Sequence, residues 1–165
     1  MLEIENLSVD YQGTRAVHNI SFCVPKGQVV GIIGPNGAGK STLVEAILGL
    51  VPTTQGTVRF QGMPLRRQLL KTAYVPQRSL VDWDYPVTVW NVVMMAQTVQ
   101  TGLFRGFSRQ VRHQARAALE RVGMYELRHR SIGELSGGQQ QRVFLARALA
   151  KEAELLIFDE PFTAV

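Results

Sequence analysis

Cysteine is almost absent from this sequence, which contains one in 165 residues. A single cysteine excludes a disulfide within the chain. That residue, Cys23, falls in an apolar segment of strand character, so we predict a buried structural thiol. Metal-ligand spacing is also lacking, because the three histidines, His18, His113 and His129, are scattered. We therefore assign no metal to the histidines.

Long apolar runs are absent as well. None approaches the roughly 18 residues that a membrane-spanning helix needs, so we expect the chain not to cross a membrane by itself. The composition, with 45% hydrophobic and 19% charged residues, is that of an ordinary globular protein. A chain of 165 residues is long enough for one well-buried core and short for two.

Acidic residues are outnumbered, with 13 aspartates and glutamates against 18 lysines and arginines, a net charge of +5. The excess gathers in one region: Arg105, Arg109, Arg112, His113, Arg116, Arg121, Arg128 and Arg130. Such a cluster contacts nucleic acid or anionic lipid in some proteins, but it is more often a solvated face, which is the reading we favour. No aromatic residues suited to stacking on bases are interleaved with it, so no nucleic-acid partner is expected.

Apolar alternation and turn residues predict most of the secondary structure. Strands are predicted over residues 2–9, 16–24, 28–33, 57–60, 73–75 and 155–158, the third and fifth of them buried. Helices are predicted after the capping residues Thr88 and Ser108, and over 139–150. The apolar faces expected for these helices are Val89, Val92, Val93 and Ala96; Val111, Ala115, Ala118 and Val122; and Leu145, Ala148 and Leu149. The order of elements predicts an α/β core with an inserted helical subdomain.

A phosphate-binding pattern, Gly-x-x-x-x-Gly-Lys-Ser/Thr, follows the predicted strand at 28–33. Strand, glycine-rich loop and helix together aim backbone N–H groups and a helix N-terminus at an anion. Glycines let the chain approach phosphate without Cβ clashes. The residues are Gly34, Pro35, Asn36, Gly37, Ala38, Gly39, Lys40, Ser41 and Thr42.

Two carboxylates end the last predicted strand, directly after the apolar residues 155–158. A carboxylate at the carboxyl end of a buried parallel strand lies where such folds bind their ligands. Asp159 is suited to hold Mg²⁺ together with the Ser41 hydroxyl. Glu160 is placed to orient or deprotonate an attacking water. The alternative is that these two acidic residues simply end a strand at the protein surface and have no role in catalysis.

A serine and two glycines open the helix predicted near residue 139, which provides a second anion-binding helix terminus. One nucleotide cannot obviously meet both termini within one subunit. Taken alone, the segment is also compatible with a plain N-cap and turn. Its sequence is Leu135-Ser136-Gly137-Gly138-Gln139-Gln140-Gln141-Arg142.

With these motifs in this order, the sequence resembles the ATP-binding subunits of ABC transporters, whose signature motif is Leu-Ser-Gly-Gly-Gln. The resemblance covers essentially the whole chain. Residues 34–42 match the Walker A loop, 155–159 match the Walker B strand, and Glu160 matches the catalytic carboxylate. Gln77 matches the Q-loop glutamine, and Tyr11 matches the aromatic residue that stacks on adenine.

The resemblance implies an α/β fold: a P-loop NTPase core of the ABC ATPase type, an N-terminal antiparallel β subdomain and an inserted helical subdomain that carries the signature. One domain would span residues 1–165. Its core and β subdomain would comprise 1–76 and 148–165, and the Q-loop and helical subdomain would comprise 77–147.

The family mechanism, carried onto this sequence, uses ATP and Mg²⁺ as cofactors. Lys40 would contact the β- and γ-phosphates while the backbone of 36–39 cradles them. Ser41, Gln77 and Asp159 would hold Mg²⁺, and Glu160 would activate water. The residues implied to be catalytic are thus Glu160, Gln77 and Lys40.

The resemblance also implies partners. Two copies would pack head to tail, so that the signature residues Ser136, Gly137, Gly138 and Gln139 approach the nucleotide bound to the other copy. Gln77 would relay closure to integral membrane permease subunits, which places the protein on the cytoplasmic side of the cell membrane. An extracytoplasmic metal-binding protein is an indirect partner.

The passage that follows the Q-loop, residues 82–90, looks like that of the manganese, zinc and iron branch of metal-ion importers. We expect an ATPase that powers import of manganese or a related divalent ion. Asp82, Asp84, Met94 and Met95 resemble metal ligands, but we assign them to docking and helix packing, because the transported ion does not touch this subunit in the family.

The chain departs from the family pattern at its end. Residues 162–165 look like the start of the D-loop, whose aspartate lies beyond the last residue, and no histidine follows Glu160 to serve as the switch. We expect a fragment or a truncated product that hydrolyses ATP weakly or not at all and tends to aggregate.

Two alternatives remain open at this point. One is a soluble ABC ATPase that acts on ribosomes or nucleic acid, which the arginine-rich region supports. The other is a P-loop kinase or GTPase, against which the signature segment argues, as does the lack of a guanine-reading Asn-Lys-x-Asp segment.

Overall fold

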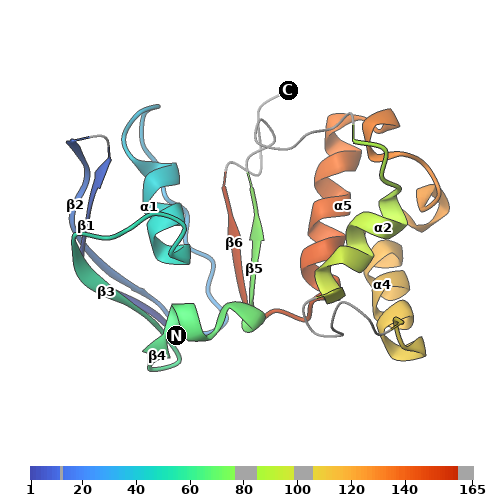
Figure 1. The fold of residues 1–165 in the computed structure, drawn as a ribbon, viewed down its shortest axis with the longest axis horizontal. Helices are drawn as coiled ribbons and strands as arrows, with labels where there is room; N and C mark the ends of the chain where they lie inside the picture. The colour runs from blue at the N-terminus through green and yellow to red at the C-terminus, as the bar shows by residue number, and fades with distance from the viewer. Residues whose placement is uncertain (12, 77–84, 99–105, 160–165) are drawn as a thin grey trace. The chain divides into compact units, whose positions relative to one another are not determined.

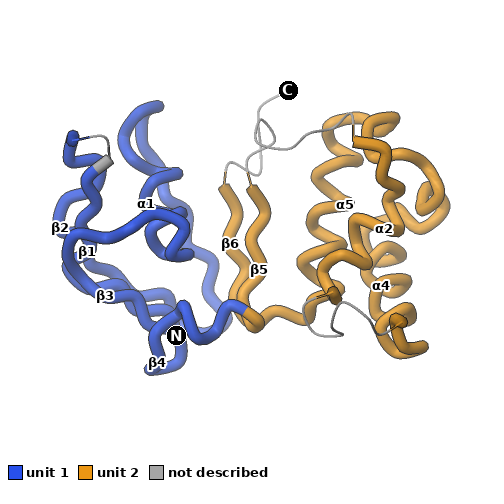
Figure 2. Tube along the Cα trace, in the orientation of Figure 1, with its two compact units in different colours: residues 1–69 blue, residues 70–165 orange. Residues whose placement is uncertain are grey.

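The structure is a computed structural model that describes residues 1–11, 13–76, 85–98 and 106–159. The chain forms two compact units, residues 1–69 and 70–165 (Figure 2). Each unit is described by itself below. The subdomain boundaries expected from the sequence are a separate division of the chain and stay a prediction.

Unit 1 is built on an antiparallel sheet with the strand order β2-β1-β3-β4 (Figure 1). The strands are β1 (Leu2–Tyr11), β2 (Thr14–Val24), β3 (Gln55–Phe60) and the short β4 (Met63–Pro64). Helix α1 (Lys40–Leu48) packs on β1 and β2. The apolar side chains of β1 and α1 form the core of this unit, chiefly Leu2, Ile4, Leu7, Val9, Leu43, Val44 and Ile47.

A β-bulge keeps the apolar residues of β1 on one face. Asn6 has a φ of 51°, and the register with β2 shifts between Ile4 and Leu7. The Asn6 N–H donates to Ser21 Oγ at 2.8 Å. The extra residue lets Ile4 and Leu7 both point inward although they are three positions apart. The strand predicted over residues 2–9 is confirmed, with a bulge that its alternation did not predict.

The buried strand predicted over residues 28–33 is wrong. These residues have no regular secondary structure, and Val29 and Ile33 are 99% and 96% exposed. A strand depends on backbone hydrogen bonds to neighbouring strands. None of the strands that the structure describes pairs with this segment. Apolar, β-branched composition is therefore not sufficient here.

The prediction that Cys23 is buried is also wrong, because the residue is exposed. It lies on β2, an edge strand whose side chains alternate between the two faces. Val24 and Phe22 are half-buried, whereas Cys23 and Ser21 lie on the solvent face. The alternation of a half-covered edge strand decides the exposure, and the apolar character of the segment does not.

Unit 2 contains a pair of parallel strands, β5 (Thr72–Val75) and β6 (Leu155–Phe158), paired from Thr72 with Leu155 to Val75 with Phe158. The Asp159 N–H donates to the Val75 carbonyl at 3.0 Å and extends the ladder by one residue. Both predicted strands are confirmed, and their carboxyl ends lie side by side.

The described part of this unit also contains the α-helices α2 (Val89–Met94), α4 (Arg109–Arg121) and α5 (Gly137–Ala150). The predicted caps are confirmed, because Thr88 Oγ1 accepts from the Asn91 N–H at 3.3 Å and Ser108 Oγ accepts from the Val111 N–H at 3.2 Å. Among the described residues, no helix is both long and apolar enough to traverse a bilayer.

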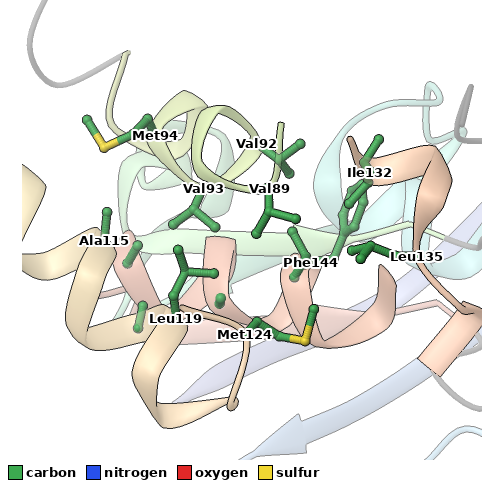
Figure 3. Packing of buried hydrophobic residues seen from close by; sticks show 14 residues of the cluster. Val89, Val92, Val93, Met94, Ala115, Leu119, Met124, Ile132, Leu135 and Phe144 are labelled. Carbon is green, nitrogen blue, oxygen red and sulfur yellow. The ribbon is translucent and has the colours of Figure 1, made fainter. Parts of the chain in front are cut away.

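The helices pack around one hydrophobic cluster (Figure 3). The faces predicted for α2 and α4 are largely confirmed, with Leu119 as a further core residue. On α5 the prediction was partly wrong: Val143 and Phe144 are buried, whereas Leu145 and Leu149 are half-buried. The cluster comprises Val89, Val92, Val93, Met94, Ala115, Ala118, Leu119, Met124, Ile132, Leu135, Val143, Phe144, Ala146 and Ala150. Met94 is thus a packing residue, as expected.

Backbone hydrogen bonds tie the start of α2 to the segment that leads into α5. The Val89 N–H donates to the Arg130 carbonyl at 3.0 Å, and the Ile132 N–H donates to the Val87 carbonyl at 2.9 Å. These bonds link the end of the 82–90 passage to the residues just before the signature segment. Because the link uses main-chain groups, it does not depend on the identity of the side chains at these positions.

Candidate functional site

The glycine-rich loop lies in unit 1 between residues 34 and 42. The Ala38 N–H donates to the Pro35 carbonyl at 3.2 Å and closes a turn. Gly39 then caps α1 with a φ of 85°, and the Leu43 N–H donates to its carbonyl at 2.8 Å. The predicted loop and the helix after it are confirmed, although the strand before it is not formed.

Gly39 must be glycine for two reasons. Its positive φ is one that side chains rarely adopt. A Cβ built on it would also lie 2.4 Å from the carbonyl oxygen of Ala16 on β2. Gly37 has a similar φ of 82° with open space around it. The loop is therefore seated on the sheet at Gly39 and open to solvent at Gly37.

The Lys40 ammonium is folded back over the loop. Its Nζ donates to the carbonyls of Gly34 and Pro35, each at 2.9 Å. These bonds connect the first residue of α1 to the first two residues of the loop and hold the positive charge above the turn. A lysine in this position is available to an anion that the loop cradles.

The N-terminus of α1 favours negative charge. No acidic residue lies in its first turn, and no side chain caps it. The first N–H groups of an α-helix have no acceptor within the helix, and the helix dipole is positive there. With Lys40 beside them, these groups form a site whose chemistry fits a phosphate chain.

In unit 2, Asp159 lies at the carboxyl end of β6 and is only 4% exposed. Its backbone N–H donates to the Val75 carbonyl of β5. This bond fixes the backbone of Asp159 at the end of the parallel pair. Carboxylate and hydroxyl oxygens, such as those of Asp159 and Ser41, are the donors that Mg²⁺ prefers. The residue types therefore fit this ion.

The signature residues form the N-terminus of α5. Ser136 and Gln139 make a reciprocal capping box. The Ser136 N–H donates to Gln139 Oε1 at 2.9 Å, and the Gln139 N–H donates to Ser136 Oγ at 3.4 Å. Leu135 is buried and anchors the segment, whereas Ser136 and Gly138 are exposed. The helix terminus is thus well ordered and open to solvent.

Gly138 serves no packing need in the part of the chain that the structure describes. A Cβ built on it would have no neighbour within 4 Å. Glycine lowers helix stability relative to alanine by roughly 0.5–1 kcal/mol, so its presence here is a cost to the fold. The absence of a side chain therefore suits a group from outside this unit that approaches the helix closely.

Gln140 is a site-supporting residue that sequence reasoning missed. It is 2% exposed, and its Nε2 donates to the Ile132 carbonyl at 3.1 Å. The bond holds the first turn of α5 against the segment that is tied to α2. In the polar run from 139 to 141, nothing in the residue types marks the middle glutamine as the buried one.

The remaining predicted site residues are placed only in part. Tyr11 ends β1, where its backbone pairs with Thr14. Gln77 and Glu160 lie outside the described residues. The phosphate loop belongs to unit 1, whereas Asp159 and the signature residues belong to unit 2.

The sequence matches a protein-family model described as ABC transporter over residues 17–163. It is 50% identical over 165 residues to the manganese transport system ATP-binding protein MntB of Halalkalibacterium halodurans, covering 100% of this chain and 66% of that protein. It is 46% identical to the zinc transport system ATP-binding protein TroB of Treponema pallidum, covering 99% of this chain and 62% of that protein. The chain thus spans about two thirds or less of the length of these relatives.

The fold is similar to a solved structure of an ATP-binding cassette of an ABC transporter in its ADP conformation. The TM-score is 0.84 at 27% sequence identity, and the match covers 100% of this chain and 70% of that one.

Proposed function

The chain belongs to the ABC transporter family, and from this premise we propose that it binds and hydrolyses ATP to power a membrane importer of manganese or a related divalent metal ion. Its fold is that of the P-loop ABC ATPases, with an antiparallel β sheet and a helical part that carries the signature motif. Family membership removes the P-loop kinase and GTPase alternatives.

The observation that carries the proposal is the seating of the phosphate loop. Gly39 fits against β2, Lys40 is held over the turn, and the N-terminus of α1 carries no acid. We propose that Lys40 exchanges its bonds to Gly34 and Pro35 for the β- and γ-phosphates of ATP. The N–H groups of residues 36–39 would donate to the same phosphates.

Mg²⁺, held by Ser41, Gln77 and Asp159, would neutralise charge on the phosphates. Asp159 suits this role because it is buried and fixed through its backbone. Glu160, the next residue, would accept a proton from the attacking water. Tyr11 would stack on the adenine. These assignments follow the family pattern and the order of the residues along the chain.

A second copy of this chain would complete each site. The exposed N-terminus of α5, with Ser136 and the unshielded Gly138, supports this arrangement. We propose a head-to-tail pair in which each signature segment contacts the γ-phosphate held by the other copy. The two anion-binding helix termini of one chain then serve two different nucleotides.

Transport of a metal ion is proposed from the relatives, which are named manganese and zinc transport ATP-binding proteins. The ATPase would lie on the cytoplasmic side of the membrane against permease subunits, with the 82–90 passage as the docking region. An extracytoplasmic metal-binding protein would deliver the ion. Neither named relative is a ribosome or nucleic-acid ATPase, so the soluble alternative has no support from them.

The test is metal uptake in cells of the organism that encodes the protein. Deletion of the gene should lower energy-dependent uptake of radioactive manganese or zinc, and the gene supplied in trans should restore it. Lys40→Ala should fail to restore uptake although the protein accumulates normally. Uptake of both metals that is unchanged by the deletion would overturn the importer proposal.

A further inference from the structure

The whole excess of positive charge lies in one short stretch of the chain. Residues 105–130 contain seven arginines, two glutamates and no lysine, a net charge of +5, which equals that of all 165 residues. The rest of the chain is therefore electrically balanced. An imbalance confined to 26 residues points to a local cause rather than to overall solubility.

Helix α4 carries three of these arginines on a solvent-exposed flank. Its buried residues are Ala115, Ala118 and Leu119. Arg109, Arg112 and Arg116 follow at spacings of three and four residues and are all exposed. At 100° per residue, they form a stripe about 60° wide along one exposed flank of the helix, next to the face that packs against α2 and α5.

Little in the described structure neutralises the stripe. Arg116 pairs with Glu120 at 2.8 Å. Arg116 and Arg128 also lie over the ring of Tyr125, with guanidinium carbons 4.8 and 4.3 Å from its centroid. Among the described residues, no ion pair reaches five of the arginines: Arg109, Arg112, Arg121, Arg128 and Arg130.

We propose that this arginine face, formed by Arg109, Arg112 and Arg116 with Arg128, which shares the Tyr125 ring with Arg116, binds the headgroups of anionic phospholipids. Arginine binds phosphate oxygens through a planar fork of donors, and the stretch contains arginine as its only strongly basic residue type. The apolar side of α4 is occupied by the core of unit 2, so contact would be with headgroups alone and would weaken with salt.

Lipid is favoured over nucleic acid by what the face lacks. Proteins that bind single strands offer aromatic rings to the bases. Tyr125, the aromatic residue beside the arginines, already carries two guanidinium groups on its ring. The protein would lie next to a bilayer only if it serves a membrane importer, so this inference rests on the proposed function.

Vesicle binding tests the inference in the purified protein. At low salt, the protein should co-sediment with vesicles in which about 30% of the lipid is anionic phosphatidylglycerol. It should not co-sediment with neutral phosphatidylcholine vesicles. Arg109→Gln with Arg112→Gln should weaken binding by roughly 20-fold, since each arginine near an anionic surface contributes about five-fold. Arg66→Gln with Arg67→Gln, an exposed pair in unit 1, is the matched control and should bind like the wild type.

Three results would overturn the inference: equal binding to neutral vesicles, equal loss in the Arg66 and Arg67 control, or tighter binding to duplex DNA or RNA at the same phosphate concentration. Binding of a fluorescent ATP analogue, measured on the same samples, separates the two proposals. Loss of lipid selectivity with nucleotide binding intact removes the lipid inference alone. Failure to bind the nucleotide in any variant counts against the proposed function instead.

Discussion

Gly39 lies at the point where the phosphate loop is fastened to the sheet. Positive φ and the carbonyl of Ala16 each exclude a side chain there. The loop pattern in the sequence predicts a glycine at this position for the sake of the ligand. The structure adds that the same glycine is needed for packing within unit 1.

Gly39→Ala should therefore lower stability more than an ordinary glycine substitution. Positive φ costs an alanine about 1–2 kcal/mol, and the clash with β2 adds roughly 1–3 kcal/mol. Gly27→Ala is the matched control, because Gly27 has a φ of 79° with nothing within 4 Å. Urea unfolding of both variants measures the difference. Equal losses would show that the contact with Ala16 is unimportant.

Gly138→Ala should have opposite effects on stability and function. The fold has room for the Cβ, so helix stability should rise by about 0.5–1 kcal/mol. ATP-dependent pairing of two copies should weaken, because the methyl group would stand between the helix terminus and a phosphate. Thermal unfolding and ATP-dependent dimerisation, measured by light scattering, provide the two readouts. Normal dimerisation would remove Gly138 from the shared site.

At the scale of single residues, the sequence predicted local backbone features better than burial. Gly39 precedes α1 with a positive φ, and Ser136 caps α5. Cys23 and Gln140 were misjudged or missed because their exposure depends on which neighbours cover them. That information lies in tertiary packing and not in the adjacent residues.

The helix starts in unit 2 were easier to predict than the conformation of residues 28–33 in unit 1. Caps at Thr88, Ser108 and Ser136 act within four residues of the chain, so the sequence contains both partners of each bond. The segment 28–33 has strand composition, but its strand needs a partner from elsewhere in the chain. Local patterns therefore predicted the helix starts, whereas the pattern at residues 28–33 could not show whether a partner strand was available.

Serine caps both α5 and α4, so the effect of Ser136 on pairing can be distinguished from its effect on helix stability. Ser136→Ala and Ser108→Ala each remove a side-chain bond at the start of a helix and should each cost about 1 kcal/mol. Only Ser136→Ala should also weaken ATP-dependent dimerisation, since α4 has no part in the proposed shared site. An equal effect of both variants on dimerisation would reduce the role of Ser136 to helix capping.

Gln140 connects α5 to the segment that is hydrogen-bonded to α2. Loss of this side chain should therefore also loosen the start of α5. Gln140→Met removes one of two donors to the Ile132 carbonyl, which keeps the Leu135 N–H at 3.3 Å, so we expect a cost of about 0.5–1.5 kcal/mol. We expect the amide exchange of residues 136–139 to speed up more than that of β5. Uniform exchange changes across unit 2 would indicate a general loss of stability only.

On the scale of the whole molecule, the predicted site residues are divided between two compact units. The phosphate loop is in unit 1, and Asp159 and the signature segment are in unit 2. The central claim is that a second copy supplies the signature segment to each bound ATP. The family resemblance implied this arrangement, which would account for the two anion-binding helix termini in one chain.

Subunit mixing tests that claim most directly, in the protein as the cell makes it. Lys40→Ala disables the loop, and Gly138→Asp places a negative charge at the signature terminus, so each variant alone should lack ATPase activity. In a head-to-tail pair of the two, one site combines an intact loop with an intact signature. Mixing should therefore restore activity, up to roughly a quarter of the wild-type rate for random pairing of equal amounts. No recovery on mixing, with both variants folded and able to pair, would contradict the shared site.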